Sequence, residues 1–132
     1  MLDWRTLAAI GVGGGIGSIL RYVITVAMTQ WLGPGFPWAT LTINITGSLI
    51  IGTVFELAQT RMLGISPLVR LFLMTGILGG YTTFSTFSLE MVNLYGEGAA
   101  GLALLYAVGS VILGFLAAFA GIVLVRSLSM HS

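Results

Sequence analysis

The sequence predicts an all-α membrane protein with four transmembrane helices. Hydrophobic residues make up 57% of its 132 residues and charged residues only 7%, whereas about a quarter of a soluble domain is charged. Charge-free runs cover residues 22–55, 71–89 and 98–125, and each can hold a bilayer span of about 20 residues. A soluble helical bundle is excluded because each of its helices would need a polar face. Residues 1–132 therefore form a single predicted transmembrane domain.

The first predicted helix covers roughly residues 5–32. Its charge-free part, residues 6–20, is followed by Arg21, and the span reaches its full length only if this arginine lies within it. Glycines four residues apart, such as Gly13 and Gly17, allow helices to approach closely in lipid. Arg21 has two equal interpretations: it draws anions into a water-filled vestibule, or it extends toward the lipid headgroups.

The second predicted helix covers roughly residues 38–59 and carries polar residues at membrane depth. Asn44 lies six residues into this helix, and Thr40 precedes it by one turn. Polar side chains cost free energy in hydrocarbon, so their presence there points to function. A hydrogen bond to a neighbouring helix is the alternative. We slightly favour pore lining for Asn44, because polar residues also cluster on the later helices.

The third predicted helix, roughly residues 67–94, contains the most informative segment, GGYTTFSTFS, at residues 79–88. The triplet Thr-Phe-Ser occurs twice in succession within it. Three residues advance a helix by about 300°, so Phe84 and Phe87 lie on one ribbon beside a ribbon of serines. A polar track edged by two aromatic rings at membrane depth indicates a permeation path.

The glycine pair at the start of this segment predicts a break in the third helix near Gly79–Thr82. Glycine is a weak helix former, and Tyr81, Thr82 and Thr83 follow the pair directly. Non-helical backbone at membrane depth must be buried in protein or line a cavity, and its free carbonyl groups can bind a cation. A simple notch for close helix packing is the equal alternative.

The fourth predicted helix covers roughly residues 99–126 and has one short polar face. Tyr106 and Ser110 lie one turn apart on this face. Taken alone, they are best interpreted as hydrogen-bonding residues inside the bundle. Four helices can hardly enclose a selective pore by themselves, so we expect a homo-oligomer.

The few charges indicate an orientation and exclude several function classes. Four arginines lie at the helix ends that carry the two termini, and only Arg21 leans toward the opposite side; the four are Arg5, Arg61, Arg70 and Arg126. The positive-inside rule therefore favours cytoplasmic termini. The net charge of +1 offers no basic patch for a nucleic acid, and the absence of cysteine excludes disulfides and thiol catalysis.

Three segments of the chain resemble the Fluc (CrcB-type) family of small fluoride channels. They are WATLTINITG at residues 38–47, GGYTTFSTFS at residues 79–88, and the first-helix glycines followed by Arg21-Tyr22. The resemblance implies a passive, fluoride-selective channel in the cell (inner) membrane that exports fluoride from the cytoplasm. It also implies an antiparallel, dual-topology homodimer with two pores and a structural sodium ion at its centre.

The motif match and the polar track together give the candidate site residues. Those expected to line the pore or bind fluoride are Phe84, Phe87, Asn44, Ser110, Tyr106, Thr40, Thr83, Ser85 and Arg21. The resemblance further implies that the backbone carbonyls of Gly79 and Thr82 hold the sodium ion. Where some members of the family carry a further hydroxyl one turn after Ser110, this chain has Gly114, so the polar track is expected to end differently.

The main alternative is a proton-coupled small multidrug exporter, which is also a small four-helix membrane protein. Such a transporter needs a titratable carboxylate deep in its binding cavity, and the four acidic residues all lie at or near predicted helix ends: Asp3, Glu56, Glu90 and Glu97. Glu90 either shapes an entrance or is simply solvated. An accessory assembly subunit would not explain the polar track with its two phenylalanines. An enzyme is not expected, since the sequence has no nucleophile–base or metal-ligand cluster.

Overall fold

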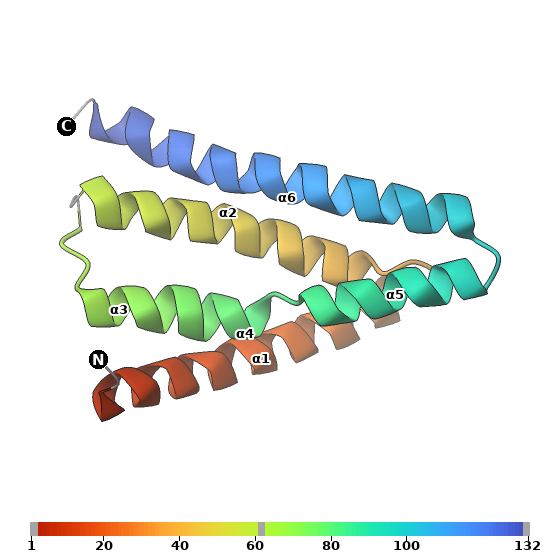
Figure 1. Ribbon diagram of the computed structural model, residues 1–132, viewed down its shortest axis with the longest axis horizontal. Helices are drawn as coiled ribbons and strands as arrows, with labels where there is room; N and C mark the ends of the chain where they lie inside the picture. Colours follow the sequence, from red (N-terminus) through yellow and green to blue (C-terminus); the bar gives the residue numbers. More distant parts are fainter. Residues whose placement is uncertain (1–2, 61–62, 131–132) are drawn as a thin grey trace.

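The computed structural model describes residues 3–60 and 63–130, which form a bundle of four helical runs (Figure 1). Three of the runs are single helices and one is interrupted. The single helices are α1 (Trp4–Leu32), α2 (Trp38–Thr60) and α6 (Ala100–Ser129). The interrupted run comprises α3 (Pro67–Leu71), the π-helix η1 (Phe72–Leu78), α4 (Gly79–Tyr81) and α5 (Phe84–Gly96).

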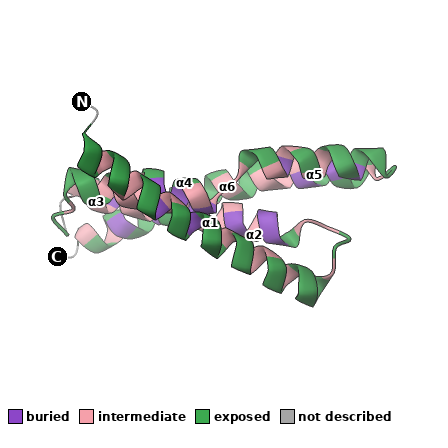
Figure 2. Cartoon of the chain, turned by 90° about the horizontal axis from the view of Figure 1, so that it is seen from below, coloured by how far each residue is buried: buried purple, intermediate pink, exposed green. Residues whose placement is uncertain are grey.

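The expected multi-pass membrane architecture is confirmed. α1, α2 and α6 are each long and apolar enough to cross a membrane, and their bounds lie within three residues of the predicted ones. The outward faces of the helices are largely exposed, and the buried positions gather where the helices meet (Figure 2). In lipid, an apolar outer surface of this kind is the expected one.

The break in the third run is also confirmed, but it lies just beyond the glycine pair. Gly79 has helical backbone angles (φ −63°, ψ −36°). The chain becomes extended at Thr82 (ψ 159°) and Thr83 (φ −152°, ψ 122°). The π-helix η1, which precedes the pair, was not expected. Extended backbone suits a β-branched residue such as threonine, so the two threonines are consistent with the position of the break.

The glycine pair contributes to packing as well. A Cβ atom on Gly80 would collide with the backbone oxygen of Gly14 in α1. Gly17 lies one helical turn after Gly13 in α1. A Cβ atom on Gly17 would collide with the backbone oxygen of Ile77 and lie 2.8 Å from the backbone nitrogen of Tyr81. α1 therefore packs backbone to backbone against η1 and α4. Both interpretations of the glycine pair thus apply: it precedes a helix break and it allows close helix packing.

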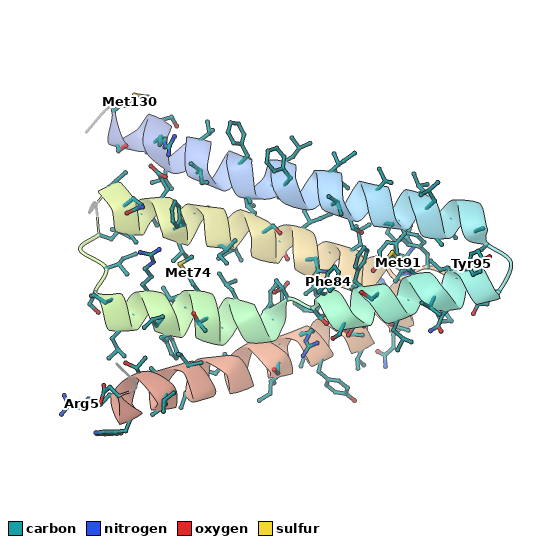
Figure 3. The ribbon with its side chains drawn as sticks, in the orientation of Figure 1. Arg5, Met74, Phe84, Met91, Tyr95 and Met130 are labelled. Atoms are coloured by element: carbon teal, nitrogen blue, oxygen red, sulfur yellow. The ribbon has the colours of Figure 1, made fainter. Side chains whose placement is uncertain are left out.

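Both chain ends lie at the same end of the bundle, where Arg5 and Met130 are seen in Figure 3. At this end Arg126 of α6 forms an ion pair with the buried carboxylate of Glu56 in α2, with an Nε–Oε1 distance of 2.8 Å. Arg61, one of the four arginines counted in the predicted orientation, lies outside the described residues. The orientation itself stays a prediction.

Candidate functional site

At the break in the third run, the side-chain amide of Asn44 binds both backbone groups of one residue, Thr83. The Thr83 N–H donates to Asn44 Oδ1 at 2.9 Å, and Asn44 Nδ2 donates to the Thr83 carbonyl at 3.0 Å. The Thr83 hydroxyl in turn accepts from the N–H of Thr86 at 3.2 Å and so caps α5. Side chains thus satisfy three backbone groups at the break: the N–H and the carbonyl of Thr83 and the N–H of Thr86. The alternative role of Asn44, hydrogen bonding to a neighbouring element, is directly visible in this geometry.

These hydrogen bonds deprive two carbonyl groups of their usual helical donors. In a continuous α-helix the N–H of Thr83 would donate to Gly79, and that of Thr86 would donate to Thr82. Here both N–H groups donate to side chains instead. Gly79 and Thr82 also line a groove of about 300 Å³ beside Asn44 and Phe84. Carbonyl oxygens are ligands that hard cations accept, so these two residues fit the predicted sodium site.

Three aromatic rings lead from this groove into the core. Phe84 lies at the break (Figure 3) and is 79% exposed, whereas Phe87 is 6% exposed. Their ring centroids are 5.8 Å apart, as expected for residues on one ribbon of a helix. Phe87 meets Tyr106 of α6 edge to face, with centroids 5.0 Å apart. The rings therefore join the exposed groove to the buried hydroxyl of Tyr106.

The Tyr106 hydroxyl belongs to a hydrogen-bonded group centred on Glu90. Tyr106 donates to Glu90 Oε2 and Thr40 donates to Glu90 Oε1, each at 2.7 Å. Tyr106 is 1% exposed and Thr40 is 3% exposed. Sequence reasoning singled out both of these residues but missed Glu90 as the group that joins them. A signal was present: Glu90 lies three residues beyond Phe87 and continues the ribbon of Phe84 and Phe87.

Arg21 lies in a separate hollow of about 240 Å³ lined largely by hydroxyl-bearing residues of α1, α2 and the start of α5. The other lining residues are Ser18, Tyr22, Thr25, Thr40, Ile43, Thr83 and Thr86. Within the described residues, the buried Nε of Arg21 has no hydrogen-bond partner, and neither does the buried Oγ of Ser110 in α6. A buried polar group without a partner costs about 1–3 kcal/mol. Water or an ion at these positions would remove that cost.

Six of the nine predicted pore residues therefore fall into three neighbouring groups. The groove contains Asn44, Thr83 and Phe84; the hollow contains Arg21, Thr40 and Thr83; and the Glu90 group contains Thr40 and Tyr106. Thr83 is common to the first two groups and Thr40 to the last two. Ser85 stands apart, since it is exposed and its hydroxyl only approaches that of Thr83 at 3.5 Å. The functional roles of these residues stay predictions.

Comparison with known proteins gives one consistent result. Residues 8–122 match the family model described as CrcB-like protein, Camphor Resistance (CrcB). The chain is 50% identical over 119 residues to the fluoride-specific ion channel FluC of Rhizobium meliloti (strain 1021), covering 90% of this chain and 94% of the relative. It is 48% identical over 122 residues to the FluC of Agrobacterium fabrum, covering 92% of this chain and 97% of that relative. The FluC of Nitrobacter winogradskyi is 46% identical over 125 residues, with coverage of 95% and 98%.

Proposed function

Because the chain belongs to the CrcB-like family, we propose that it is a fluoride-selective channel through which fluoride leaves the cytoplasm. The observation that supports this most strongly is the line of rings from Phe84 through Phe87 to Tyr106, whose hydroxyl donates to the Glu90 carboxylate.

The physical chemistry of this line suits a small, strongly hydrated anion. Aromatic rings have positively polarised edges, so the phenylalanines can face fluoride without offering a charge that would trap it. The hydroxyls of Thr40 and Tyr106 are donors that can replace part of the hydration shell. At rest both donate to Glu90. A fluoride ion that arrived there would compete with the carboxylate for these donors.

We further propose that the working unit is an antiparallel homodimer with two pores. Phe84 is 79% exposed in the single chain, and a second copy over the groove would bury it. The carbonyls of Gly79 and Thr82 would bind a structural sodium ion. Two carbonyl oxygens from each copy would bring its coordination number closer to what hard cations require. When bound, the ion supplies a fixed positive charge that raises the local potential for an anion.

Fluoride efflux from liposomes tests the proposed function. Purified protein should release fluoride rapidly and chloride hardly at all, with protein-free liposomes as the control. The assay should also be run with and without a proton gradient at clamped voltage, because the proposed pathway includes the carboxylate of Glu90, which Thr40 and Tyr106 hydrogen-bond. Efflux that strictly required the gradient would favour the proton-coupled exporter. Equal release of chloride would contradict fluoride selectivity.

A further inference from the structure

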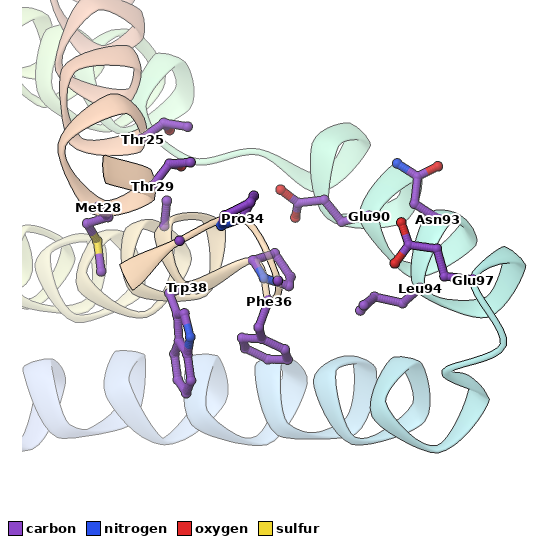
Figure 4. Close-up of a pocket in the computed structure, with 14 residues that line it drawn as sticks. Thr25, Met28, Thr29, Pro34, Phe36, Trp38, Glu90, Asn93, Leu94 and Glu97 are labelled. Atoms are coloured by element: carbon purple, nitrogen blue, oxygen red, sulfur yellow. The ribbon is translucent and has the colours of Figure 1, made fainter. Parts of the chain in front are cut away.

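A cavity of about 230 Å³ opens at the end of the bundle opposite the chain termini (Figure 4). It lies between the last turns of α1, the loop at residues 33–37 and one face of α5. Of the described residues that line it, only Glu90 and Glu97 are charged, and both are acidic. Both carboxylates point from the α5 side toward the loop in Figure 4. An anion at this point would meet negative charge only.

The two carboxylates differ in their bonding. Glu90 is half-buried and accepts hydrogen bonds from Thr40 and Tyr106, so it belongs to the proposed pathway. Glu97 follows seven residues later, about 10 Å along the helix axis, and is exposed. The ion pair found within the described residues, Glu56–Arg126, is at the other end of the bundle. The charge of Glu97 is therefore not neutralised by a neighbouring cation in the described structure.

The cavity is next to the pathway at two points. Glu90 lines the cavity and binds Thr40, and Thr25 lines both the cavity and the hollow of Arg21. The walls around an ionised group at a membrane surface are poorly polarisable, so they focus its field into the opening. A unit charge about 10 Å away changes the local concentration of a monovalent ion about twofold even in water.

We propose that this cavity is a mouth of the anion pathway and that Glu97 limits the rate at which fluoride reaches Glu90. The inference rests on the proposed function and adds a rate-determining residue to it. Glu97 lowers the local anion concentration, so fluoride flux through this mouth is smaller at low ionic strength than the pathway itself would allow. Salt screens the charge, because the Debye length falls from about 30 Å at 0.01 M to about 3 Å at 1 M.

The chain contains no cysteine, which permits a direct test by charge replacement at one position. The variant Glu97→Cys is reacted with methanethiosulfonate reagents that add a positive, a neutral or a negative group of similar size. Fluoride efflux is then measured at low and high concentrations of an impermeant salt. At low salt we expect the order positive, neutral, negative, with about a twofold difference at each step. At high salt the three rates should converge.

Three controls distinguish the possible outcomes. The unmodified wild-type chain should be insensitive to all three reagents, and Glu97→Gln should exceed the wild type at low salt only. Asp3→Cys, which alters an exposed carboxylate just before α1 at the other end of the bundle, should respond little to the same reagents. A wild type that carries fluoride while modified Glu97→Cys shows one rate for all three charges overturns the inference alone. An equal response at Asp3→Cys also overturns it, whereas a wild type that carries no fluoride refutes the proposed function itself.

Discussion

Phe84 and Phe87 share one ribbon of α5 but have very different surroundings, and this difference makes their predicted role testable. Phe87 is 6% exposed and packs against Tyr106, whereas Phe84 is 79% exposed. If both act through their ring edges, Phe→Ile at either position should strongly reduce fluoride flux, since isoleucine is bulky and apolar but has no quadrupole. Efflux from liposomes measures this effect, and gel filtration shows whether the protein remains folded.

A purely structural role for the phenylalanines predicts a different pattern. Phe87→Ile would then be mild because the volume changes little. Phe87→Ala would create a cavity and cost about 3–5 kcal/mol. Phe84→Ala would cost the single chain little, given its exposure. Normal flux in both isoleucine variants would rule out the aromatic mechanism.

Asn44 should prove essential for the structure of the break as well as for transport. Asn44→Ala leaves the N–H and the carbonyl of Thr83 without the partners seen here, at about 1–3 kcal/mol for each group. Asn44→Asp is the matched variant of equal shape, because an ionised aspartate can accept from the N–H but cannot donate to the carbonyl. We expect both variants to lower the thermal midpoint in detergent, followed by tryptophan fluorescence, and to lower flux. An unchanged midpoint with reduced flux would show instead that Asn44 acts only on the anion.

At the scale of single residues, the sequence could predict residue types at membrane depth but not their partners. Thr40 and Tyr106 were candidates because polar residues are costly in lipid. Glu90 was placed near a helix end, either shaping an entrance or solvated, because a count along the chain does not show which side chains converge. Its two hydrogen bonds come from residues 50 and 16 positions away. Only the packing of α2, α5 and α6 brings these three groups together.

At the scale of elements, the break was predictable and the π-helix was not. The glycine pair and the following threonines weaken a helix locally, which gave the right region. The switch from α- to π-type hydrogen bonding over Phe72–Leu78 has no comparable signature in the local sequence. It occurs where the third run packs backbone to backbone on the glycines of α1. We therefore expect the position of the break to depend on a neighbouring helix as well as on the local residues.

The dependence on α1 can be tested at Gly17. In Gly17→Ala the new Cβ atom would collide with the backbone of Ile77 and approach that of Tyr81, and backbone atoms cannot move aside without shifting α1 away from the break. We expect a lower thermal midpoint and reduced fluoride flux. Gly15→Ala is the matched control, because a Cβ atom there has no atom within 4 Å and alanine is the better helix former by about 1 kcal/mol. If both variants behaved alike, close packing at Gly17 would not be what positions the break.

At the scale of the whole molecule, the charge-free runs predicted a four-span plan, because a helix needs about 20 consecutive apolar residues to cross the bilayer. Which spans pack against one another could be learned only from the structure. α2 and α6 pack closely along their length and are joined by the Glu56–Arg126 ion pair, a pairing of residues 70 positions apart. A hydrophobicity pattern without polar faces cannot specify which helices are neighbours.

The arginines and the proposed dimer make opposing predictions about orientation. Arg5 at the start of α1, Arg70 in α3 and Arg126 in the last turn of α6 belong to segments at the end of the bundle that carries the termini (Figure 1). Their positive charge favours a single orientation with this end in the cytoplasm. The ion pair of Arg126 with Glu56 does not remove this bias, because the rule counts lysine and arginine and acidic residues contribute little. An antiparallel homodimer instead requires both orientations in equal amounts.

Labelling of single cysteines from one side of the membrane decides between the two. The native chain has no cysteine, so Asp3→Cys and Glu97→Cys can report on opposite ends of the bundle without background. For the antiparallel dimer, an impermeant thiol reagent outside sealed vesicles should label about half of the copies of each variant, since both orientations coexist. The remaining copies should react once the vesicles are opened. If one variant is fully labelled from outside and the other not at all, the arginine bias determines the topology, and the dimer cannot be antiparallel.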